Sequence, residues 1–326
     1  MKRASMKRTP MQLCLRGVVL LSSLAIPALG QSLHSVATLD TPVAVQRAFL
    51  CGEGAEAIGI GSDGALYGWK LPSPQARKIV ALEGSPRRFD CTARNTLAVS
   101  QSNGVVLILD AESGAVRQKI ETRQRVQNLS LSPDGSLLLI STNLSPTQLW
   151  DAQTAKLIST SATNLGTSRT NAFSPTGRFY VSADEDTRIR AYDQKGKLLY
   201  EADGGLLEPF AVTFSGDGKQ FAVAGGDGAV RLFDAASGKI LKTAPGTGNP
   251  IVALQMSPNG ERVLALEVDD FRLAPLSFSL WEVREATSKP LALDHIESIV
   301  GAGRSKSQLL LLRRESENHL TLSSLE

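Results

Sequence analysis

Short runs in which apolar and polar residues alternate fill most of the chain. The run at 229–234, AVRLFD, is typical, because apolar positions recur at every second residue between flanking turn residues. Alternation with a period of two predicts β-strands, and dipeptides such as Asp-Gly at 227–228 and Ser-Gly at 237–238 predict tight turns. The stretch 210–243 therefore predicts four short strands joined by turns, which form one small antiparallel sheet.

This four-strand pattern recurs at a nearly constant interval. The turn between the first two strands marks it best, and reads SPDG at 132–135, SPTG at 174–177, SGDG at 215–218 and SPNG at 257–260. Aligning the repeats on the first residue of this turn gives seven anchors: Cys51, Cys91, Ser132, Ser174, Ser215, Ser257 and Ser305. Successive anchors lie 40, 41, 42, 41, 42 and 48 residues apart. Seven four-stranded units with this period predict an all-β fold, a seven-bladed β-propeller.

The two ends of the repeat region are predicted to share one blade. The seventh unit ends soon after its third strand, 319–325, and therefore lacks a fourth strand. One period before the first unit, residues 33–38 align with the fourth strand of the fifth unit, 239–244. We expect this N-terminal strand to complete the last blade and close the ring, which removes two exposed sheet edges.

The repeats resemble the WD-repeat family over residues 31–326. The motif DGAVRLFD at 227–234, the Leu-Trp-Asp triplet at 149–151 and the SPDG turns carry this resemblance. Lactonase-like and TolB-like bacterial propellers are similar in the SPDG turn and the strand pattern. All of these relatives imply the same antiparallel propeller architecture.

The resemblance also implies structural roles for several residues. WD repeats carry an aspartate in the turn between the second and third strands and an aromatic-Asp pair at the end of the third strand. The matching residues here are Asp63, Asp186, Asp227, Trp150 and Asp151. His295 stands in the slot of the family's histidine, which implies a hydrogen bond to a turn carboxylate such as Glu317 rather than catalysis. The other blades lack this histidine.

The first thirty residues differ in composition from the repeats. A basic start is followed by an apolar run at 17–26 and by small residues at 28–30, which predicts a secretory signal peptide cleaved before Gln31. The apolar run is shorter than the ~20 residues that span a bilayer, although an uncleaved membrane anchor is the alternative. We therefore expect a signal peptide at 1–30 and an exported propeller at 31–326, periplasmic or extracellular.

Removal of the leader changes the charge and the cysteine count. The leader carries five Lys/Arg and no Asp/Glu, so the mature chain has a net charge of −2. This near-neutral charge gives no indication of nucleic-acid binding. Cys14 lies in the leader, which leaves Cys51 and Cys91 as a candidate disulfide. The sequence leaves this pairing open, because neighbouring first strands sit near the ~7 Å Cα limit for a disulfide and Cys91 fits the repeat better if shifted by one residue.

Catalytic signatures are missing from the sequence. It contains no nucleophile elbow, phosphate loop or zinc-binding motif, so we predict no catalytic residue, no cofactor and no metal. The alternative is a lactonase-like or other hydrolase that holds a divalent metal in the central channel. Its candidate ligands are Asn171, Glu208, Asn249 and Glu297. The acidic run at 184–186 is predicted to be a solvated turn, because it lacks the alternating oxygen ligands of a calcium loop.

Two features favour recognition of a partner. Arginines gather in the loops or strand starts that lead into blades one to four: Arg47, Arg87, Arg88, Arg123, Arg125 and Arg169. Corresponding stretches of later blades are acidic, with Asp203, Glu208, Asp294 and Glu297. The insertion of blade six, within 268–281, carries Phe271 and Leu273. A solvated rim and a hairpin tucked onto its own blade are the simpler explanations of these two features.

From these features we predict a monomeric, non-enzymatic platform for protein–protein interaction. Its partner is expected to be an acidic protein or peptide, since arginines beside apolar side chains are typical of interaction hot spots. The predicted contact residues are Arg87, Arg88, Arg125, Arg169, Phe271 and Leu273.

Overall fold

A computed structural model defines the fold. It describes residues 33–51, 54–92, 94–161, 168–205, 208–246, 248–268, 275–285, 287–291, 299–304 and 308–325. The chain divides into two units, Met1–Gly30 and Gln31–Glu326. The first unit, which contains the predicted signal peptide, lies outside the described residues. No helix among the described residues is long and apolar enough to cross a membrane.

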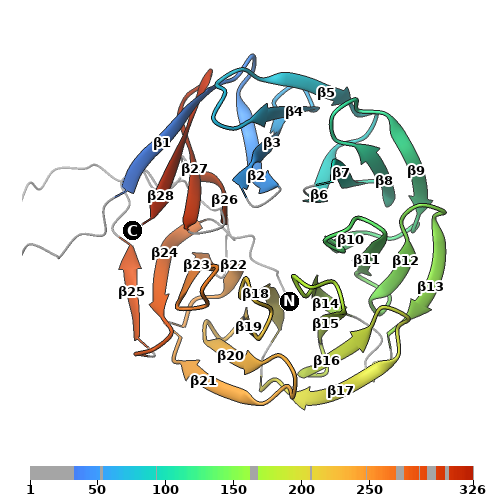
Figure 1. Cartoon of the computed structure of the whole chain (residues 1–326), viewed down its shortest axis with the longest axis vertical. Coiled ribbons are helices and arrows are strands. Elements are labelled where there is room, and N and C mark those ends of the chain that lie inside the picture. The colour runs from blue at the N-terminus through green and yellow to red at the C-terminus, as the bar shows by residue number, and fades with distance from the viewer. Residues whose placement is uncertain are drawn as a thin grey trace, which may run out of the picture. The chain divides into compact units, whose positions relative to one another are not determined.

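Seven four-stranded antiparallel sheets arranged in a ring make up the second unit, as predicted (Figure 1). Blade one consists of β2 (Val45–Cys51), β3 (Glu56–Gly61), β4 (Ala65–Lys70) and β5 (Arg77–Ala81). Blade two consists of β6 (Pro86–Cys91), β7 (Thr96–Gln101), β8 (Val105–Asp110) and β9 (Val116–Glu121). Blade three consists of β10 (Val126–Leu131), β11 (Leu137–Thr142), β12 (Gln148–Asp151) and β13 (Lys156–Thr160). Blade four consists of β14 (Ser168–Phe173), β15 (Phe179–Asp184), β16 (Arg188–Asp193) and β17 (Leu198–Asp203). Blade five consists of β18 (Pro209–Phe214), β19 (Gln220–Gly225), β20 (Val230–Asp234) and β21 (Ile240–Ala244). Blade six consists of β22 (Ile251–Met256), β23 (Arg262–Val268), β24 (Pro275–Glu282) and β25 (Thr287–Leu291). Blade seven consists of β26 (Ile299–Arg304), β27 (Leu309–Ser316), β28 (His319–Leu325) and β1 (Leu33–Asp40). The first strand of each blade is innermost and the fourth outermost.

The predicted ring closure is confirmed. Strand β1 pairs antiparallel with β28, with Leu33 opposite Leu325 and Asp40 opposite His319. The Trp69 indole N–H of blade one donates to the Asp40 carbonyl oxygen at 2.8 Å, which ties the closing strand to the next blade. The last sheet thus gains its fourth strand from the other end of the repeat region.

The hydrophobic core lies between neighbouring blades. Aromatic residues near the end of the third strand are buried in several blades, and two of them stack on the second strand: Tyr192 on Tyr180 at 5.1 Å and Phe233 on Phe221 at 4.9 Å between ring centroids. Each such buried side chain contributes about 1.5–3 kcal/mol of hydrophobic stabilisation. The repeated aromatic position is therefore a packing position.

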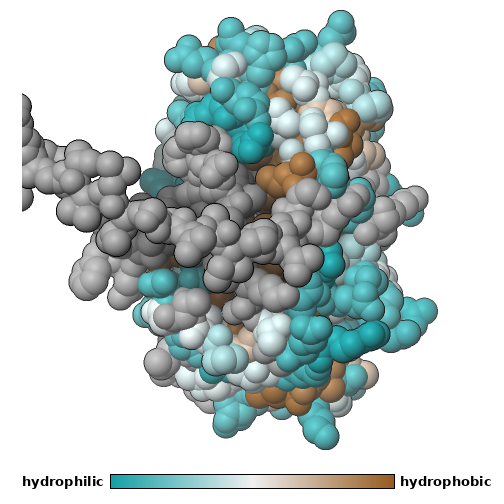
Figure 2. Space-filling view, turned by 90° about the vertical axis from the view of Figure 1, so that its left-hand side faces the viewer, coloured by the Kyte–Doolittle hydropathy of each residue, from teal (hydrophilic) through white to brown (hydrophobic). Residues whose placement is uncertain are grey.

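The outer surface is mostly polar. Figure 2 views the molecule from the left-hand side of Figure 1 and shows mainly hydrophilic residues with small hydrophobic patches on the described surface. Exposed apolar side chains occur on the outermost strands, where Leu157, Leu199 and Leu241 are examples. Scattered exposed apolar residues are normal for a folded protein.

The SPDG turns have a local structural cause. The Ser132 hydroxyl donates to Asp134 Oδ1 at 2.6 Å and accepts the Leu137 N–H at 2.9 Å. Gly135 adopts a positive φ of 73°, which favours glycine at the last turn position. Ser215 makes the same pair of bonds to Asp217 and the Gln220 N–H. The motif is therefore a hydrogen-bonded hairpin.

Blade two departs from this hairpin, and the sequence alignment on Cys91 is wrong by one residue. Counted from the first residue of the innermost strand, Thr92 holds the position of Cys51 and Ser132. The hairpin is one residue shorter, since Thr92 N–H donates to the Thr96 carbonyl whereas Ser132 N–H donates to that of Leu137. Cys91 precedes the slot and forms a disulfide with Cys51, with Cα atoms 5.5 Å apart. The bond links blades one and two.

The predicted turn aspartates bind partners on their own blade. Asp63 accepts the Tyr67 hydroxyl at 2.9 Å, and Asp227 pairs with Arg231 at 2.6 Å. In both cases the partner lies four residues later, on the third strand. His295, the family's histidine, lies outside the described residues. In these blades a third-strand side chain thus binds the turn aspartate.

Trp150 and Asp151 lie where the third strand of blade three ends. Trp150 is half-buried and its indole N–H donates to Gln148 Oε1 at 3.0 Å. Asp151 Oδ1 accepts the backbone N–H groups of Gln153 and Thr154 at 2.9 and 2.8 Å. Asp151 therefore organises the turn into β13, which is a structural role.

Candidate binding site on the inner strands

Every innermost strand carries a β-bulge between its first and third residues. Positions counted from the first residue of each of the seven strands are therefore equivalent. The third residues are Arg47, Arg88, Asn128, Thr170, Ala211, Ala253 and Gly301. A bulge bends the strand and redirects the next side chain. Equivalent third residues therefore occupy equivalent places around the ring.

A cavity of about 280 Å³ lies between the inner strands of blades two to six. Its walls differ in chemistry. Strands β6, β10 and β14 contribute polar residues together with Phe89, Leu129 and Ala172, the polar ones being Asp90, Asn128, Ser130, Thr170 and Asn171. Strands β18 and β22 contribute only apolar residues, among them Phe210, Val212, Val252 and Leu254. The third residues of blades three to six all line this cavity. Arg47 and Arg88 hold the equivalent positions in blades one and two.

Four arginines cluster at this inner edge: Arg47, Arg87, Arg88 and Arg125, hereafter the inner arginines. All four side chains are exposed, and none forms an ion pair with a carboxylate within the described ranges. Desolvation by surrounding protein lowers the pKa of Arg88, and the positive charges of Arg47, Arg125 and Arg87 lower it further. The cluster therefore holds like charges close together without a matching anion in the described part of the fold.

Arg169 was predicted with these residues, but its setting differs. Its Nε donates to Glu185 at 2.7 Å, and a second guanidinium nitrogen lies 3.5 Å from Glu208. The guanidinium also lies over the Phe210 ring, 5.7 Å from its centroid. Glu208, predicted as part of an acidic arc, is thus partly matched by Arg169, and the predicted basic and acidic arcs meet here.

The loops that lead into each blade share a face with the turns between second and third strands. Arg125 N–H donates to Asn143 Oδ1 at 3.0 Å, and Gly226 N–H donates to the Glu208 carbonyl at 3.1 Å. Both bonds join a loop leading into a blade to the second-to-third turn of the same blade. Phe271 and Leu273, predicted at such a turn in blade six, lie outside the described residues.

Asp90 faces the same cavity and was missed by the sequence reading. Its carboxylate accepts the Cys91 N–H at 2.8 Å and the Leu131 N–H of the next blade at 2.6 Å. Burial raises its pKa to about 6 against the lowering effect of these bonds. Ser130 and Thr213 accept an N–H from the next blade at the same strand position. In the sequence, a polar residue at the fifth position of the innermost strand would have indicated this hydrogen bond to the next blade.

The structure gives no support to a metal cluster in the described part of the chain. No group of three or more His, Cys, Asp or Glu residues there could hold a metal ion. Of the predicted ligands, Asn171 is buried and donates to Ser141 Oγ at 2.6 Å, and Glu208 contacts Arg169. Glu297 lies outside the described residues.

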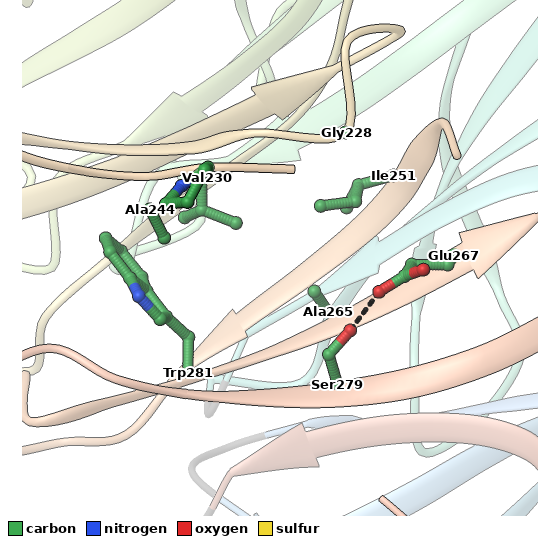
Figure 3. A pocket seen from close by; sticks show the side chains of 9 residues that line it. Gly228, Val230, Ala244, Ile251, Ala265, Glu267, Ser279 and Trp281 are labelled. Carbon is green, nitrogen blue, oxygen red and sulfur yellow. Dashed lines mark hydrogen bonds between the residues drawn. The ribbon is translucent and has the colours of Figure 1, made fainter. Parts of the chain in front are cut away.

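A second pocket lies between blades five and six (Figure 3). Its volume is about 10 Å³, roughly the space for one water molecule. The Ser279 hydroxyl donates to Glu267 on one side of the pocket, and the Trp281 ring lies on the other side (Figure 3). A substrate or peptide does not fit in this space, so the inner cavity is the better candidate site.

Blade four contradicts the prediction of a solvated acidic turn. Asp184 and Arg190 are 0% and 2% exposed, and their charged groups are 2.6 Å apart. Arg190 also binds Asp186 at 2.6 Å and Glu201 at 2.8 Å, while Ser168 donates to Asp184. The side chains of Asp184 and Asp186 are buried because Arg190, on the strand after the turn, folds back over both of them, whereas Glu185 between them is partly exposed.

The charges of this network stabilise each other. Burial raises the pKa of Asp184 to about 6, although the bonds from Ser168 and Arg190 act in the opposite direction. Burial alone would lower the pKa of Arg190, but its bonds to Asp186 and Asp184 raise it. Arg190 thus remains charged inside the fold because carboxylates surround it.

Comparison with known proteins supports the architecture. The family described as the anaphase-promoting complex subunit 4 WD40 domain matches residues 172–259. The coronin-like protein crn1 of Schizosaccharomyces pombe is 24% identical over 203 residues, which are 53% of this chain and 33% of that protein. The chain thus spans about a third of the length of this curated relative. Both matches agree with the resemblance that the repeats suggested.

Proposed function

We propose that this chain, a WD-repeat-like β-propeller, is an exported, non-enzymatic platform that binds an acidic protein or peptide. The observation that carries the proposal is the cluster of inner arginines beside the cavity. Four like charges without a carboxylate partner destabilise a compact fold through mutual repulsion. A bound acidic group relieves that repulsion, so a ligand explains the cluster better than stability does.

The position of the cluster suits recognition. Arginine is enriched at interaction hot spots, where it forms paired hydrogen bonds with carboxylates. Complementary charge also speeds the encounter of the two partners. The fold itself leaves the function open, because the same architecture carries many activities. The site residues therefore support the proposal more than the architecture does.

Export rests on two observations. The leader at 1–30 has the charge and apolar pattern of a signal peptide. The disulfide between Cys51 and Cys91 is a bond that persists mainly in oxidising compartments. Both support a periplasmic or extracellular mature chain from Gln31 onward, and we propose separately that this chain is monomeric. Intact mass and light scattering of the exported protein test these parts, and a retained leader or a stable dimer would contradict them.

Capture from the exported fraction tests the platform. The mature chain and a variant with all four inner arginines changed to glutamine are immobilised side by side. The partner is expected to bind the first and not the second, and to be released by high salt because the contact is electrostatic. Arg178→Gln is the matched control, an exposed arginine in the SPTG turn region away from the cluster.

Two results would overturn the proposal. Equal capture by the wild-type chain and the four-glutamine variant would show that the inner arginines are not the recognition surface. One stoichiometric divalent ion in the purified protein, lost together with a hydrolase activity, would contradict the non-enzymatic part.

A further inference from the structure

The inner cavity has an apolar side, and two arginines stand next to its lining, at the equivalent strand positions of blades one and two. The third residues of blades one and two are Arg47 and Arg88, whereas those of blades five and six are Ala211 and Ala253. Val212, Val252 and Leu254 add further apolar surface on the alanine side. These three side chains are only partly buried, so the apolar side is accessible from the cavity.

Asp90 makes one part of the cavity unfavourable for an anionic group. It lies two residues after Arg88 on the same strand and therefore on the same face of that strand. Both of its oxygens already accept backbone N–H groups, and it presents no positive charge to a ligand. An anionic group is thus favoured at the level of Arg47 and Arg88 and disfavoured deeper, at the level of Asp90.

The volume limits what enters. A cavity of about 280 Å³ is smaller than the ~300–1,000 Å³ of most small-molecule pockets, but far larger than one water. It therefore has room for one side chain and a neighbouring charged group, not for a large cofactor.

We propose that the cavity receives a short segment of the acidic partner in which a carboxylate adjoins an apolar side chain. The carboxylate lies against Arg47 and Arg88, and the apolar side chain packs against the wall formed by β18 and β22. This inference rests on the proposed function and names the part of the partner that the site reads. Charge alone fixes the position of the segment poorly, whereas an adjoining apolar contact adds selectivity.

Three blocked dipeptides serve as probes, each with an acetyl group and a C-terminal amide: leucyl-aspartate, alanyl-aspartate and leucyl-asparagine. Binding to the purified mature chain is followed by NMR titration or calorimetry. Leucyl-aspartate is expected to bind at least about tenfold more tightly than either of the others, because burial of each methylene is worth up to about fourfold. Leucyl-asparagine differs from leucyl-aspartate only in lacking the negative charge, so this second comparison measures what the charge contributes to binding.

Two variants test whether the carboxylate of the probe contacts the arginines and its leucine side chain contacts the apolar wall formed by β18 and β22. Arg47→Gln combined with Arg88→Gln is expected to weaken leucyl-aspartate to the level of leucyl-asparagine and to leave leucyl-asparagine unchanged. Ala253→Leu fills the apolar side and is expected to weaken leucyl-aspartate to the level of alanyl-aspartate. Arg178→Gln is again the control and should bind all three probes like the wild-type chain.

Equal binding of leucyl-aspartate and alanyl-aspartate, or binding that Ala253→Leu leaves unchanged, would overturn the inference. So would the absence of binding by all three dipeptides. These failures differ from failure of the proposed function. If capture of the acidic partner still depends on the inner arginines, the platform stands and only the carboxylate-plus-apolar reading is wrong.

Discussion

The inner arginines of blades one to three and the third-strand arginines Arg190 and Arg231 of blades four and five have opposite surroundings. Arg190 and Arg231 lie on the third strands of their blades and each binds the turn aspartate four residues earlier at 2.6 Å. Arg47 and Arg88 lie on innermost strands and have no carboxylate partner among the described residues. The same side chain thus supports the fold in one part of the ring and is left free in another.

This difference separates structural from recognition charges. A buried ion pair contributes little compared with apolar residues of the same shape, but the loss of one partner strands the other charge in the core. An exposed arginine beside other arginines has no such dependence. The surroundings of each arginine therefore predict which variants unfold the protein and which leave the fold unchanged.

The largest effect is expected when the buried pair of blade four is broken. Arg190→Leu leaves Asp184 and Asp186 without their cation, and we expect the free energy of unfolding to fall by about 3–5 kcal/mol. Urea denaturation at neutral pH measures this loss. Arg117→Leu, which removes an exposed pair with Asp110, should lose less than about 1 kcal/mol. Similar losses in the two variants would show that blade four gains nothing special from burial.

The next effect concerns the covalent link between the blades that carry Arg47 and Arg88. Reduction of the Cys51–Cys91 bond, which closes a sequence separation of 40, is expected to lower the free energy of unfolding by about 2–4 kcal/mol. Denaturation with and without a reductant measures it. A variant with both cysteines changed to serine should show no response, and a wild-type chain equally insensitive would contradict a formed disulfide.

A smaller, pH-dependent effect is expected from Asp90, the carboxylate on the same strand as Arg88. Burial raises its pKa from 3.8 to about 6, so the folded state holds the proton more tightly than the unfolded state. Its contribution to stability is complete below pH 3.8 and is lost as the pH rises through about 6. We expect the stability of the wild-type chain relative to Asp90→Asn to fall over this window and to stay level above it. A relative stability that rises with pH would show that Asp90 pairs with the inner arginines instead.

The repeat made most of the fold predictable. Alternation, the SPDG turns and the period near 41 predicted seven blades and their closure by 33–38, because each follows from local hydrogen bonds and packing that recur in every unit. The alignment failed by one residue at Cys91, where a shorter hairpin moves Thr92 into the slot. A degenerate copy gives too little sequence signal to place such a deletion.

The site was predictable only as a set of residue types. The arginines that lead into blades one to four look alike in sequence, and only the structure shows that Arg169 pairs with Glu185 while the inner arginines do not. Burial of Asp184 was missed because its cation comes from the strand after the turn. A spacing of four between an aspartate and an arginine across a hairpin, as in Asp186 and Arg190, would have indicated the pair.

The most direct test of the comparison is the stability of Arg88→Gln measured at two salt concentrations. At about 0.01 M salt, where charges act over ~30 Å, removal of one repelling charge should leave the free energy of unfolding equal to that of the wild-type chain or above it. At about 1 M salt, where the range is ~3 Å, the two proteins should agree within about 0.5 kcal/mol. A loss above about 1 kcal/mol at either concentration would show that Arg88 supports the fold, which contradicts the division between structural and recognition arginines.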